Sequence, residues 1–399
     1  MSLPEQFSEL VKQHLHDDVQ QLALQRNRFP QLSDADFRFL LQQVEGYQRT
    51  CDKLPTLSAL PDWWFPVRLS CEQCSSEATA DYKAQIAGAC RRLIDLTAGY
   101  GIDTFHLAAT AGEAHYVERN ADLCRIAAHN FALYRENIQV HNTTAEAFLA
   151  DLREADEAAS TLIYLDPARR SQSGGKVFRI EDCEPNVVEL LPTLRKHAAR
   201  IMIKFSPMLD ITAALRALGT DWDTHIVAVN NEVKEVLLVT GEGILHAVNI
   251  RTREMRTDRF CFRPEDEKLS PMRLAPAIQQ YIYEPNAAII KAGAYRLIAE
   301  QYGLSKLDVN THLYTSDTYI SGFPGRVWEV IDAEIKEPKK QLDKAVRYSI
   351  LSRNYPLSPE EIRKKYKLRD GDEQYLIAAR HQGKPLLIGA RRLAQTTAL

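Results

Sequence analysis

The stretch LIDLTAGYGIDTF, residues 93–105, has an acidic residue at the end of an apolar run and then two glycines separated by one residue. Gly99 and Gly101 let the backbone turn tightly and approach a ligand, because glycine has no side chain to clash. Asp95, at the end of the apolar run, is placed to hydrogen-bond the polar groups of such a ligand. The spacing predicts a turn that binds a nucleotide-like molecule.

The residue at position 104 narrows the choice of ligand. The dinucleotide fingerprint GxGxxG needs glycine or alanine there, and this chain has Thr104, so a pyrophosphate cradle is incomplete. S-adenosylmethionine needs no such cradle; it needs room for its methionine part beside the glycines and acceptors for its ammonium group. The residues that we expect to bind it around this turn are Asp95, Thr97, Gly99, Tyr100, Gly101, Asp103 and Thr104.

A second acidic residue follows the next apolar run. Glu118, in AHYVERN, comes 17 residues after Gly101 and is followed by Arg119. A carboxylate at the end of the neighbouring strand could accept hydrogen bonds from both hydroxyls of a ribose. The ribose of NAD would suit it equally well, so Glu118 alone does not distinguish the two cofactors. We include Glu118 and Arg119 in the candidate cofactor site.

A third acidic residue follows a later apolar run, in TLIYLDPARRSQSGGKVFR. Asp166 could hydrogen-bond the edge of a base or take up a proton, and Pro167 and Arg169 complete the candidate catalytic group. The basic segment that follows could fold over substrate phosphates or be an ordinary polar loop; it includes Arg169, Arg170, Gly174, Gly175, Lys176 and Arg179. Lys204, after the next apolar run, could steer a phosphate or pair with Asp166.

Alternating apolar runs and helical patterns must position these side chains. Five strand–helix repeats extend over residues 93–218, which is typical of a parallel sheet with helices on both faces. THIVAVN and VKEVLLVT follow, with too few residues between them for a helical crossover, so they form an antiparallel hairpin. The predicted fold class is α/β, a Rossmann-like parallel sheet with a terminal antiparallel hairpin.

DLTAGYG, VERN, DPAR and this hairpin together resemble a class I S-adenosylmethionine-dependent methyltransferase over about residues 70–245. The whole chain resembles a bacterial family of such enzymes with a ferredoxin-like segment and a THUMP-like C-terminal domain. The resemblance implies S-adenosylmethionine as cofactor. THUMP domains are associated with RNA-modifying enzymes, which implies a tRNA or rRNA substrate. Many methyltransferases have Asp at the third strand end for the adenine amino group; here Thr144, the Ala145 amide or Glu146 could take that role.

Two departures from known motifs bear on the methylated atom. Enzymes that methylate exocyclic amino groups commonly have Pro and an aromatic after Asp-Pro or Asn-Pro, and here Ala168 and Arg169 stand there. Asp-Pro-Ala-Arg instead resembles the 5-methyluridine RNA methyltransferases, which attack the base with a cysteine at the end of the next strand. That position, in IKFSPMLD, has Ser206, and Cys183 lies in a different loop. We therefore expect methylation of a base nitrogen. The alternatives are an inactive RNA-binding protein on this fold and a small-molecule methyltransferase.

The 399 residues are enough for several hydrophobic cores. The expected parts are an N-terminal helical domain with a connector (1–68), the methyltransferase domain (69–262), a ferredoxin-like α+β segment (263–335) and a basic THUMP-like domain (336–399). The connector contains Trp63 and Trp64, for which we expect packing in a core rather than stacking on a base.

Charge and cysteine content bear on possible partners. From Lys336 onward there are 15 Lys or Arg against 7 Asp or Glu, although the whole chain has a net charge of −3. This asymmetry favours contact with a polyanion such as RNA, although IRKKYKLR alone would be an ordinary solvated helix face. Seven scattered cysteines are typical of reduced thiols, and the pair Cys71 and Cys74 lacks further ligands at zinc spacing, so we expect no metal. The polar N-terminus and the short apolar runs predict a cytoplasmic protein with no membrane contact.

Overall fold

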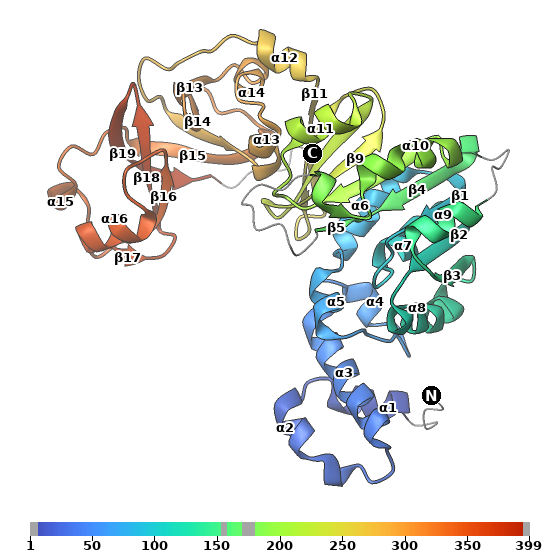
Figure 1. The fold of residues 1–399 in the computed structure, drawn as a ribbon. Coiled ribbons are helices and arrows are strands. Elements are labelled where there is room, and N and C mark those ends of the chain that lie inside the picture. Colours follow the sequence, from blue (N-terminus) through green and yellow to red (C-terminus); the bar gives the residue numbers. More distant parts are fainter. Residues whose placement is uncertain (1–6, 153–157, 170–179, 394–399) are drawn as a thin grey trace. The chain divides into compact units, whose positions relative to one another are not determined.

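The computed structural model describes residues 7–152, 158–169 and 180–393 (Figure 1). By its internal contacts the chain divides into two compact units, residues 1–223 with 235–242 and residues 224–234 with 243–399. The boundary between the units falls inside the hairpin that the sequence predicts at the end of the methyltransferase sheet.

Short helices form the N-terminal part of the first unit. They are α1 (Phe7–His14), α2 (Val19–Leu24), α3 (Asp34–Thr50), α4 (Pro55–Ser58), α5 (Arg68–Gln73) and α6 (Glu77–Ala87). Ser33 caps α3 by accepting a hydrogen bond from the Asp36 amide, as the sequence SDADF predicts. Leu40 and Val44 of α3 are fully buried in a small core that the first helices enclose.

A mixed sheet follows, with the strand order β11-β10-β8-β9-β7-β4-β1-β2-β3. Its first strands are β1 (Cys90–Asp95), β2 (Ala111–Glu118), β3 (Ile138–Asn142), β4 (Thr161–Leu165), β7 (Arg200–Phe205), β8 (Trp222–Val229) and β9 (Glu232–Thr240). β3, β2, β1, β4 and β7 run parallel, and β9 pairs antiparallel with β7. Asn230 and Asn231, both with positive φ, form the tight turn between β8 and β9. The predicted sheet is confirmed.

The helices of this region alternate with its strands. They are α7 (Ile102–Leu107), α8 (Ala121–Tyr134), α9 (Ala145–Asp151), α10 (Val187–His197) and α11 (Ile211–Leu218). The last four begin directly after Asn120, Thr144, Asn186 and Asp210, and each of these side chains accepts a hydrogen bond from a backbone amide of the first turn. Capping residues therefore fix where each helix starts beside the end of a strand.

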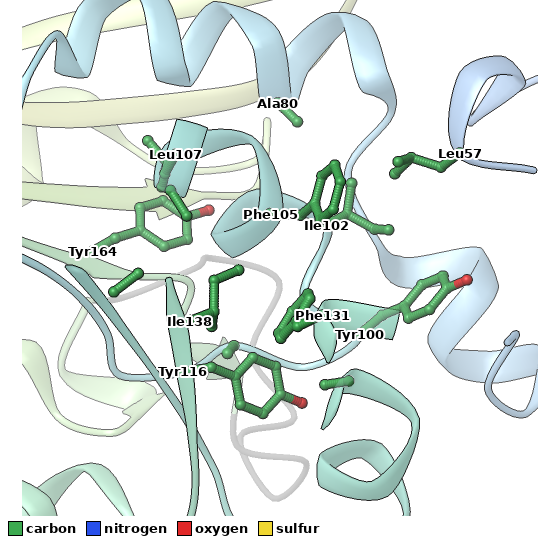
Figure 2. Close-up of a cluster of buried hydrophobic side chains, with 14 of the residues drawn as sticks. Leu57, Ala80, Tyr100, Ile102, Phe105, Leu107, Tyr116, Phe131, Ile138 and Tyr164 are labelled. Carbon is green, nitrogen blue, oxygen red and sulfur yellow. The ribbon is translucent and has the colours of Figure 1, made fainter. Parts of the chain in front are cut away.

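Alternate side chains of each strand face two different layers of helices. In β4, Leu162 and Tyr164 pack with residues of α6, α7 and α8, whereas Ile163 and Leu165 pack with residues of α9, α10 and α11. Figure 2 shows the first of these clusters, with Tyr164 among the labelled side chains. The helices therefore cover both faces of the sheet, as the strand–helix repeats predict.

Two strands of this sheet have no counterpart in the predicted pattern. β10 (Leu245–Arg251) pairs parallel with β8, and β11 (Arg256–Phe262) pairs antiparallel with β10. Their sequences, LHAVNIR and RTDRFCF, alternate apolar and polar residues over much of their length, which is the pattern of a half-buried strand. The sheet therefore has two strands, β10 and β11, in addition to those predicted from the strand–helix repeats and the hairpin.

The second unit also contains an eight-stranded sheet of order β13-β14-β12-β15-β19-β18-β16-β17. Its strands are β12 (Tyr281–Pro285), β13 (Ser305–Asp308), β14 (Thr311–Ser316), β15 (Gly325–Asp332), β16 (Arg347–Arg353), β17 (Arg369–Asp370), β18 (Gln374–His381) and β19 (Lys384–Arg392). Its helices are α12 (Pro264–Leu269), α13 (Ala287–Ala292), α14 (Leu297–Gln301), α15 (Pro338–Gln341) and α16 (Pro359–Tyr366). Ser358 begins α16 with a capping box, and β18 and β19 form the hairpin across HQGK, as the sequence predicts.

The predicted boundary between residues 335 and 336 follows β15, which pairs with β12 on one side and with β19 on the other. The ferredoxin-like segment and the basic C-terminal segment therefore share one sheet. In the part of the chain that the structure describes, every helix is too short or too polar to cross a lipid bilayer.

Candidate functional site

The two glycines of the predicted turn adopt left-handed backbone conformations, with φ of 56° at Gly99 and 87° at Gly101. A Cβ added at Gly101 would lie 2.7 Å from Phe131 Cζ and 3.1 Å from Tyr116 Cε2, and Figure 2 shows both rings beside the turn. At Gly99 the nearest atom would be 4.0 Å away. Gly101 is thus required for both the turn and its packing, whereas Gly99 borders open space that a ligand can occupy.

Asp95 is fully buried, and the turn itself engages its carboxylate. Oδ1 accepts a hydrogen bond from the Thr97 amide at 3.1 Å, and Oδ2 accepts one from Thr104 Oγ1 at 2.6 Å. Burial raises the pKa of this carboxyl group to about 8, although the two hydrogen bonds oppose the shift. Asp95 and buried Thr104 therefore brace the turn from inside, because β1 directs the carboxyl group toward α7. Direct contact of either residue with a ligand stays a prediction.

Tyr100 is also directed into the protein, with 5% of its surface exposed. Its hydroxyl accepts a hydrogen bond from Trp63 Nε1 at 2.7 Å and donates one to Trp64 O at 3.2 Å. Trp63 is buried, which confirms core packing for this tryptophan, whereas Trp64 is half-buried and stacks on His129. Tyr100 thus ties the glycine turn to the connector, and its contact with the cofactor stays a prediction.

Asp103 belongs to a buried network of charges that the sequence analysis did not identify. Its Oδ2 accepts hydrogen bonds from Ser75 Oγ at 2.8 Å and Tyr164 Oη at 2.7 Å. Lys83 Nζ lies 3.2 Å from Asp103 Oδ1 and donates to both oxygens of Glu235, at 2.7 and 2.8 Å. The clue in the sequence is Glu235, an acid at the start of the apolar run EVLLVT.

The two acids of this network shift in opposite directions. Burial raises the pKa of the Asp103 carboxyl, but the charges of Lys83 and Lys204 and two hydrogen bonds outweigh it, so the net pKa is lowered. Burial also raises the pKa of Glu235, and Lys83 offsets it only in part, so that pKa stays raised. The surroundings therefore favour the ionised form of Asp103 more than that of Glu235.

Glu118 ends β2 and faces the glycine turn. Its Oε2 accepts a hydrogen bond from the Gly99 amide at 3.0 Å, and its Oε1 accepts one from the Asn120 amide at 2.8 Å. Tyr116 Oη donates to Gly99 O at 2.5 Å, which holds the turn against β2 from the other side. The half-buried carboxylate keeps acceptor lone pairs beside the open space at Gly99. Neighbouring hydroxyls of a ribose fit such a group.

The remaining predicted cofactor residues lie farther along the same edge. Arg119 is exposed and donates a hydrogen bond to Glu184 Oε1 at 2.7 Å. Thr144 caps α9 by accepting a hydrogen bond from the Ala147 amide at 3.2 Å, and Ala145 is buried. The hydroxyl of Thr144 is thus occupied at the start of a helix, which leaves the contact with an adenine amino group a prediction.

Asp166 lies directly beside the turn. Its amide donates a hydrogen bond to Thr97 Oγ1 at 2.5 Å, and its Oδ2 accepts one from Lys204 Nζ. Burial lowers the pKa of Lys204, but the carboxylates of Asp166, Asp103 and Glu235 outweigh it and raise the pKa overall, so Lys204 stays charged. Of the two roles considered for Lys204, the structure shows the pairing with Asp166. Pro167 is buried and completes the end of β4.

Arg169 has a described backbone but a side chain outside the described residues. β5 (Ala168–Arg169) pairs antiparallel with β6 (Cys183–Glu184), which places Arg169 opposite Cys183. The other residues of the predicted basic segment, Arg170, Gly174, Gly175, Lys176 and Arg179, also lie outside the described residues.

The predicted acids therefore divide into two groups. Asp95 and Asp103 point into the protein and support the turn, whereas Glu118 and Asp166 are partly exposed, with 37% of the Asp166 side chain accessible. The turn joins the last two, since Gly99 bonds Glu118 and Thr97 bonds Asp166. Glu118 can accept hydrogen bonds from a ribose, and Asp166 can orient a second molecule beside it.

The cysteines are free thiols, and within the described residues they belong to no cluster that could bind a metal ion. None of the seven, all within the described ranges, forms a disulfide. Burial raises the pKa of Cys71 to about 12 and also raises that of Cys74, so both thiols stay protonated at neutral pH. Among the residues that the structure describes, no group of three or more His, Cys, Asp or Glu could hold a metal ion.

Known protein families and solved structures are similar to this chain. Family models match a ferredoxin-like domain over residues 281–324 and a THUMP domain-like segment over residues 325–392. A Porphyromonas gingivalis W83 protein of known crystal structure, described as a methyltransferase, is 31% identical; the match covers 99% of this chain and 100% of that one, with a TM-score of 0.86. Proteins of Mycobacterium tuberculosis strains H37Rv and CDC 1551, named as S-adenosylmethionine-dependent methyltransferases, are 25% identical over 272 residues, 65% of this chain and 70% of theirs.

Proposed function

Since this chain belongs to a family of S-adenosylmethionine-dependent methyltransferases, we propose that it transfers the methyl group of this cofactor to a base nitrogen in structured RNA. The observation that carries the proposal is the pair of partly exposed acids, Glu118 and Asp166, held on either side of one glycine turn. One acid suits the sugar of the cofactor and the other suits the acceptor, so the two substrates would meet at this turn.

Residues of the turn and of β2 would hold the cofactor. Glu118 would accept hydrogen bonds from the ribose hydroxyls, and the backbone at Gly99, which has open space beside it, would lie along the methionine part. Asp95, Asp103 and Thr104 would act indirectly, because their hydrogen bonds fix the turn from inside. When bound, S-adenosylmethionine supplies an electrophilic methyl group on a sulfonium.

Asp166 would orient the acceptor base and stabilise the positive charge that develops on a nitrogen as it is methylated. Lys204 holds the Asp166 carboxylate in one position, and the bond from the Asp166 amide to Thr97 fixes its distance from the turn. Such a reaction needs little acid–base assistance, so most of the rate enhancement would come from positioning the two substrates.

A nitrogen is favoured over carbon 5 of a pyrimidine because neither of the two candidate nucleophiles in the described part of the chain suits that reaction. The residue after β7 is Ser206, whose hydroxyl is a weak nucleophile without an activating base. Cys183 is fully buried in β6. A carbon-5 mechanism would need one of these two groups to attack the base.

The distribution of charge supports RNA as the substrate. Of the 15 basic residues after position 335, twelve are exposed. Lys364, Lys365 and Lys367 lie together at the end of α16 with their side chains in solvent. Exposed cations of this kind bind a polyanion through phosphate contacts that weaken steeply with salt.

The direct test is mass spectrometry of modified nucleosides in total RNA from cells with and without the gene. One methylated nucleoside should be lost in the deletion strain and restored by the wild-type gene, and Asp166→Ala should fail to restore it. Calorimetry should show that Asp166→Ala binds S-adenosylmethionine within a few-fold of the wild type. Unchanged nucleosides in the deletion strain would contradict an RNA substrate.

A small-molecule substrate is the alternative that this test must exclude. Deleting residues 336–399 would remove strands from the eight-stranded sheet, so charge substitution is the cleaner variant. A chain with Lys364, Lys365 and Lys367 all changed to Gln should lose RNA affinity, keep its fold and methylate RNA more slowly. If this variant methylates RNA at the wild-type rate at moderate salt, α16 is not part of the RNA-binding surface.

A further inference from the structure

The second unit contains a cavity of about 590 Å³ that no step of the proposed methyl transfer uses. It lies at the end of β12 and the start of α13, and residues of β14, β15 and β16 also line it. Its charged and aromatic lining consists of Glu284, Lys291, Tyr295, His312, Arg326 and Arg353. A cavity of this size is in the range that binds small ligands or single units of a polymer.

Glu284 organises the two arginines of this cavity. It is buried, with 5% of its surface exposed. Arg326 donates to Glu284 Oε2 from Nε at 2.9 Å and also from Nη2, and Arg353 donates to Glu284 Oε1 from Nε at 2.5 Å. One carboxylate thus fixes two guanidinium groups, whose side chains remain 31% and 41% exposed. Preorganised guanidinium groups bind phosphate without a large loss of side-chain entropy.

Each arginine keeps a donor available for a ligand. Arg353 uses Nη1 for a bond to Ser352 O at 2.9 Å. Within the described part of the chain, Arg326 Nη1 and Arg353 Nη2 form no hydrogen bond. Two guanidinium groups thus share one carboxylate, and Lys291 also lines the cavity, so its lining suits an anion.

The lining of the cavity also contains an aromatic pair. Tyr295 and His312 stack with ring centroids 3.9 Å apart and an interplanar angle of 22°. Burial lowers the pKa of His312 to about 4, so the imidazole is neutral at pH 7 and adds no charge. Its Nδ1 is buried and has no hydrogen-bond partner among the described residues. Flat neutral rings beside fixed cations match a ligand that has both a planar ring and a phosphate.

We infer that this cavity binds one nucleotide, with its phosphate on Arg326 and Arg353 and its base against Tyr295 and His312. The nucleotide could belong to a single-stranded part of the RNA or be a free mononucleotide; the chemistry of recognition is the same. As an RNA contact, the inference rests on the proposed function, but nucleotide binding itself does not. The cavity needs both C-terminal segments, because Arg326 and Arg353 lie within the THUMP domain-like match and the aromatic pair lies within the ferredoxin-like match.

The test is calorimetry of the full chain with S-adenosylhomocysteine present in saturating amount, so that adenine nucleotides cannot report binding at the glycine turn. The probes are the four nucleoside 5′-monophosphates, adenosine, inorganic phosphate and a single-stranded oligoribonucleotide. At least one monophosphate or the oligonucleotide should bind at least tenfold more tightly than adenosine and inorganic phosphate. Equal affinity for phosphate and nucleotides would overturn a role for the aromatic pair.

Three variants locate the binding. Arg353→Gln should weaken mononucleotide affinity at least tenfold and Tyr295→Leu several-fold. Arg391→Gln, which removes an exposed arginine paired with Glu329 in the same sheet, should leave mononucleotide affinity unchanged. Tyr295→Leu leaves the ion pairs of Glu284 intact, so it remains informative if Arg353→Gln does not fold. Wild-type affinity in both cavity variants, or no binding of any probe at millimolar concentration, would refute the inference.

The results of these experiments distinguish a nucleotide of RNA from a free nucleotide. They also distinguish a failure of this inference from a failure of the proposed function. Tighter binding of the oligonucleotide than of any mononucleotide assigns the cavity to RNA, and the reverse order assigns it to a free nucleotide; either result supports the inference. Methylated RNA together with no nucleotide binding would refute this inference and leave the proposed function standing. Cavity-dependent nucleotide binding together with no RNA methylation would refute the proposed function alone.

Discussion

Lys204, at the end of β7, donates a hydrogen bond to the carboxylate of Asp166, at the end of β4. The side chain of Lys204 is only 13% exposed, and Asp166 is the partly exposed member of the pair. The two neighbouring parallel strands therefore present one acid in a single fixed position beside the glycine turn. Lys204 acts on the acceptor side of the site through Asp166, without being exposed enough to contact a large substrate.

Changing Lys204 to Met should therefore reduce turnover and leave cofactor binding nearly intact. A charge-assisted hydrogen bond contributes about 1.5–3 kcal/mol, so kcat should fall by about 10–100-fold. Lys204→Arg should recover part of the loss, because the guanidinium also donates to a carboxylate. Lys196→Met, an exposed lysine at the end of α10, is the control and should behave like the wild type. A Lys204→Met enzyme with normal kcat would show that Asp166 needs no partner.

The two glycines of the turn should differ in their tolerance of alanine. Both have positive φ, which costs an alanine about 1–2 kcal/mol. At Gly101 the added methyl group would also meet Phe131 and Tyr116, and overpacking costs about 1–3 kcal/mol more. The free energy of unfolding, measured in urea, should therefore be lower for Gly101→Ala than for Gly99→Ala. At Gly99 the methyl group would enter the open space beside the turn, so cofactor affinity should fall although stability falls less. Equal unfolding free energies for the two variants would contradict this packing.

Glu118→Gln should weaken S-adenosylmethionine binding by about 10–100-fold, because a charged acceptor for the ribose hydroxyls is replaced by a neutral one. The amide oxygen of Gln can still accept from the Gly99 amide, so the fold should be kept. Glu113→Gln changes an acid on the same strand that pairs with Arg92 away from the turn, and it should bind the cofactor normally. Calorimetry with the three proteins gives the comparison. The same affinity in Glu118→Gln and Glu113→Gln would place the ribose elsewhere.

Much of the fold could be predicted because local patterns determine it. The strand–helix repeats predicted the parallel sheet and its helices, and the glycine turn was located from residue spacing alone. The direction of Asp95 could not be predicted, because adjacent residues of a strand buried on both faces point into different layers. Leu93 and Ile94 show this, since they belong to opposite clusters.

The buried network could not be predicted for a different reason. Lys83 and Glu235 are 152 residues apart in sequence, and their contact depends on the order of the strands. Lys83 resembles an ordinary surface charge in the sequence, and the place of Glu235 at the start of an apolar run does not identify its partner. β10 and β11 were missed although their alternating pattern is visible in the sequence, because the strand–helix repeats and the hairpin already accounted for a complete sheet.

The buried Asp95 should make the stability of the protein depend on pH in a specific window. Its pKa is about 8 in the folded state and 3.8 as its ordinary value, so between these pH values the native protein keeps a proton that the unfolded chain releases. The free energy of unfolding should therefore be highest below pH 4 as far as this group is concerned. It should fall as the pH rises toward 8, by at most about 1.4 kcal/mol per pH unit.

Asp95→Asn removes this dependence, because the amide is neutral at every pH and can still accept from the Thr97 amide. The variant should gain stability relative to the wild type as the pH rises from 4 to 8, with no relative gain below pH 4. Urea unfolding at a series of pH values measures the difference, and Asp122→Asn, an exposed acid of α8, should track the wild type throughout. Parallel stability curves for Asp95→Asn and the wild type would mean that Asp95 is ionised in the folded protein, with its charge balanced by Thr104 and the turn.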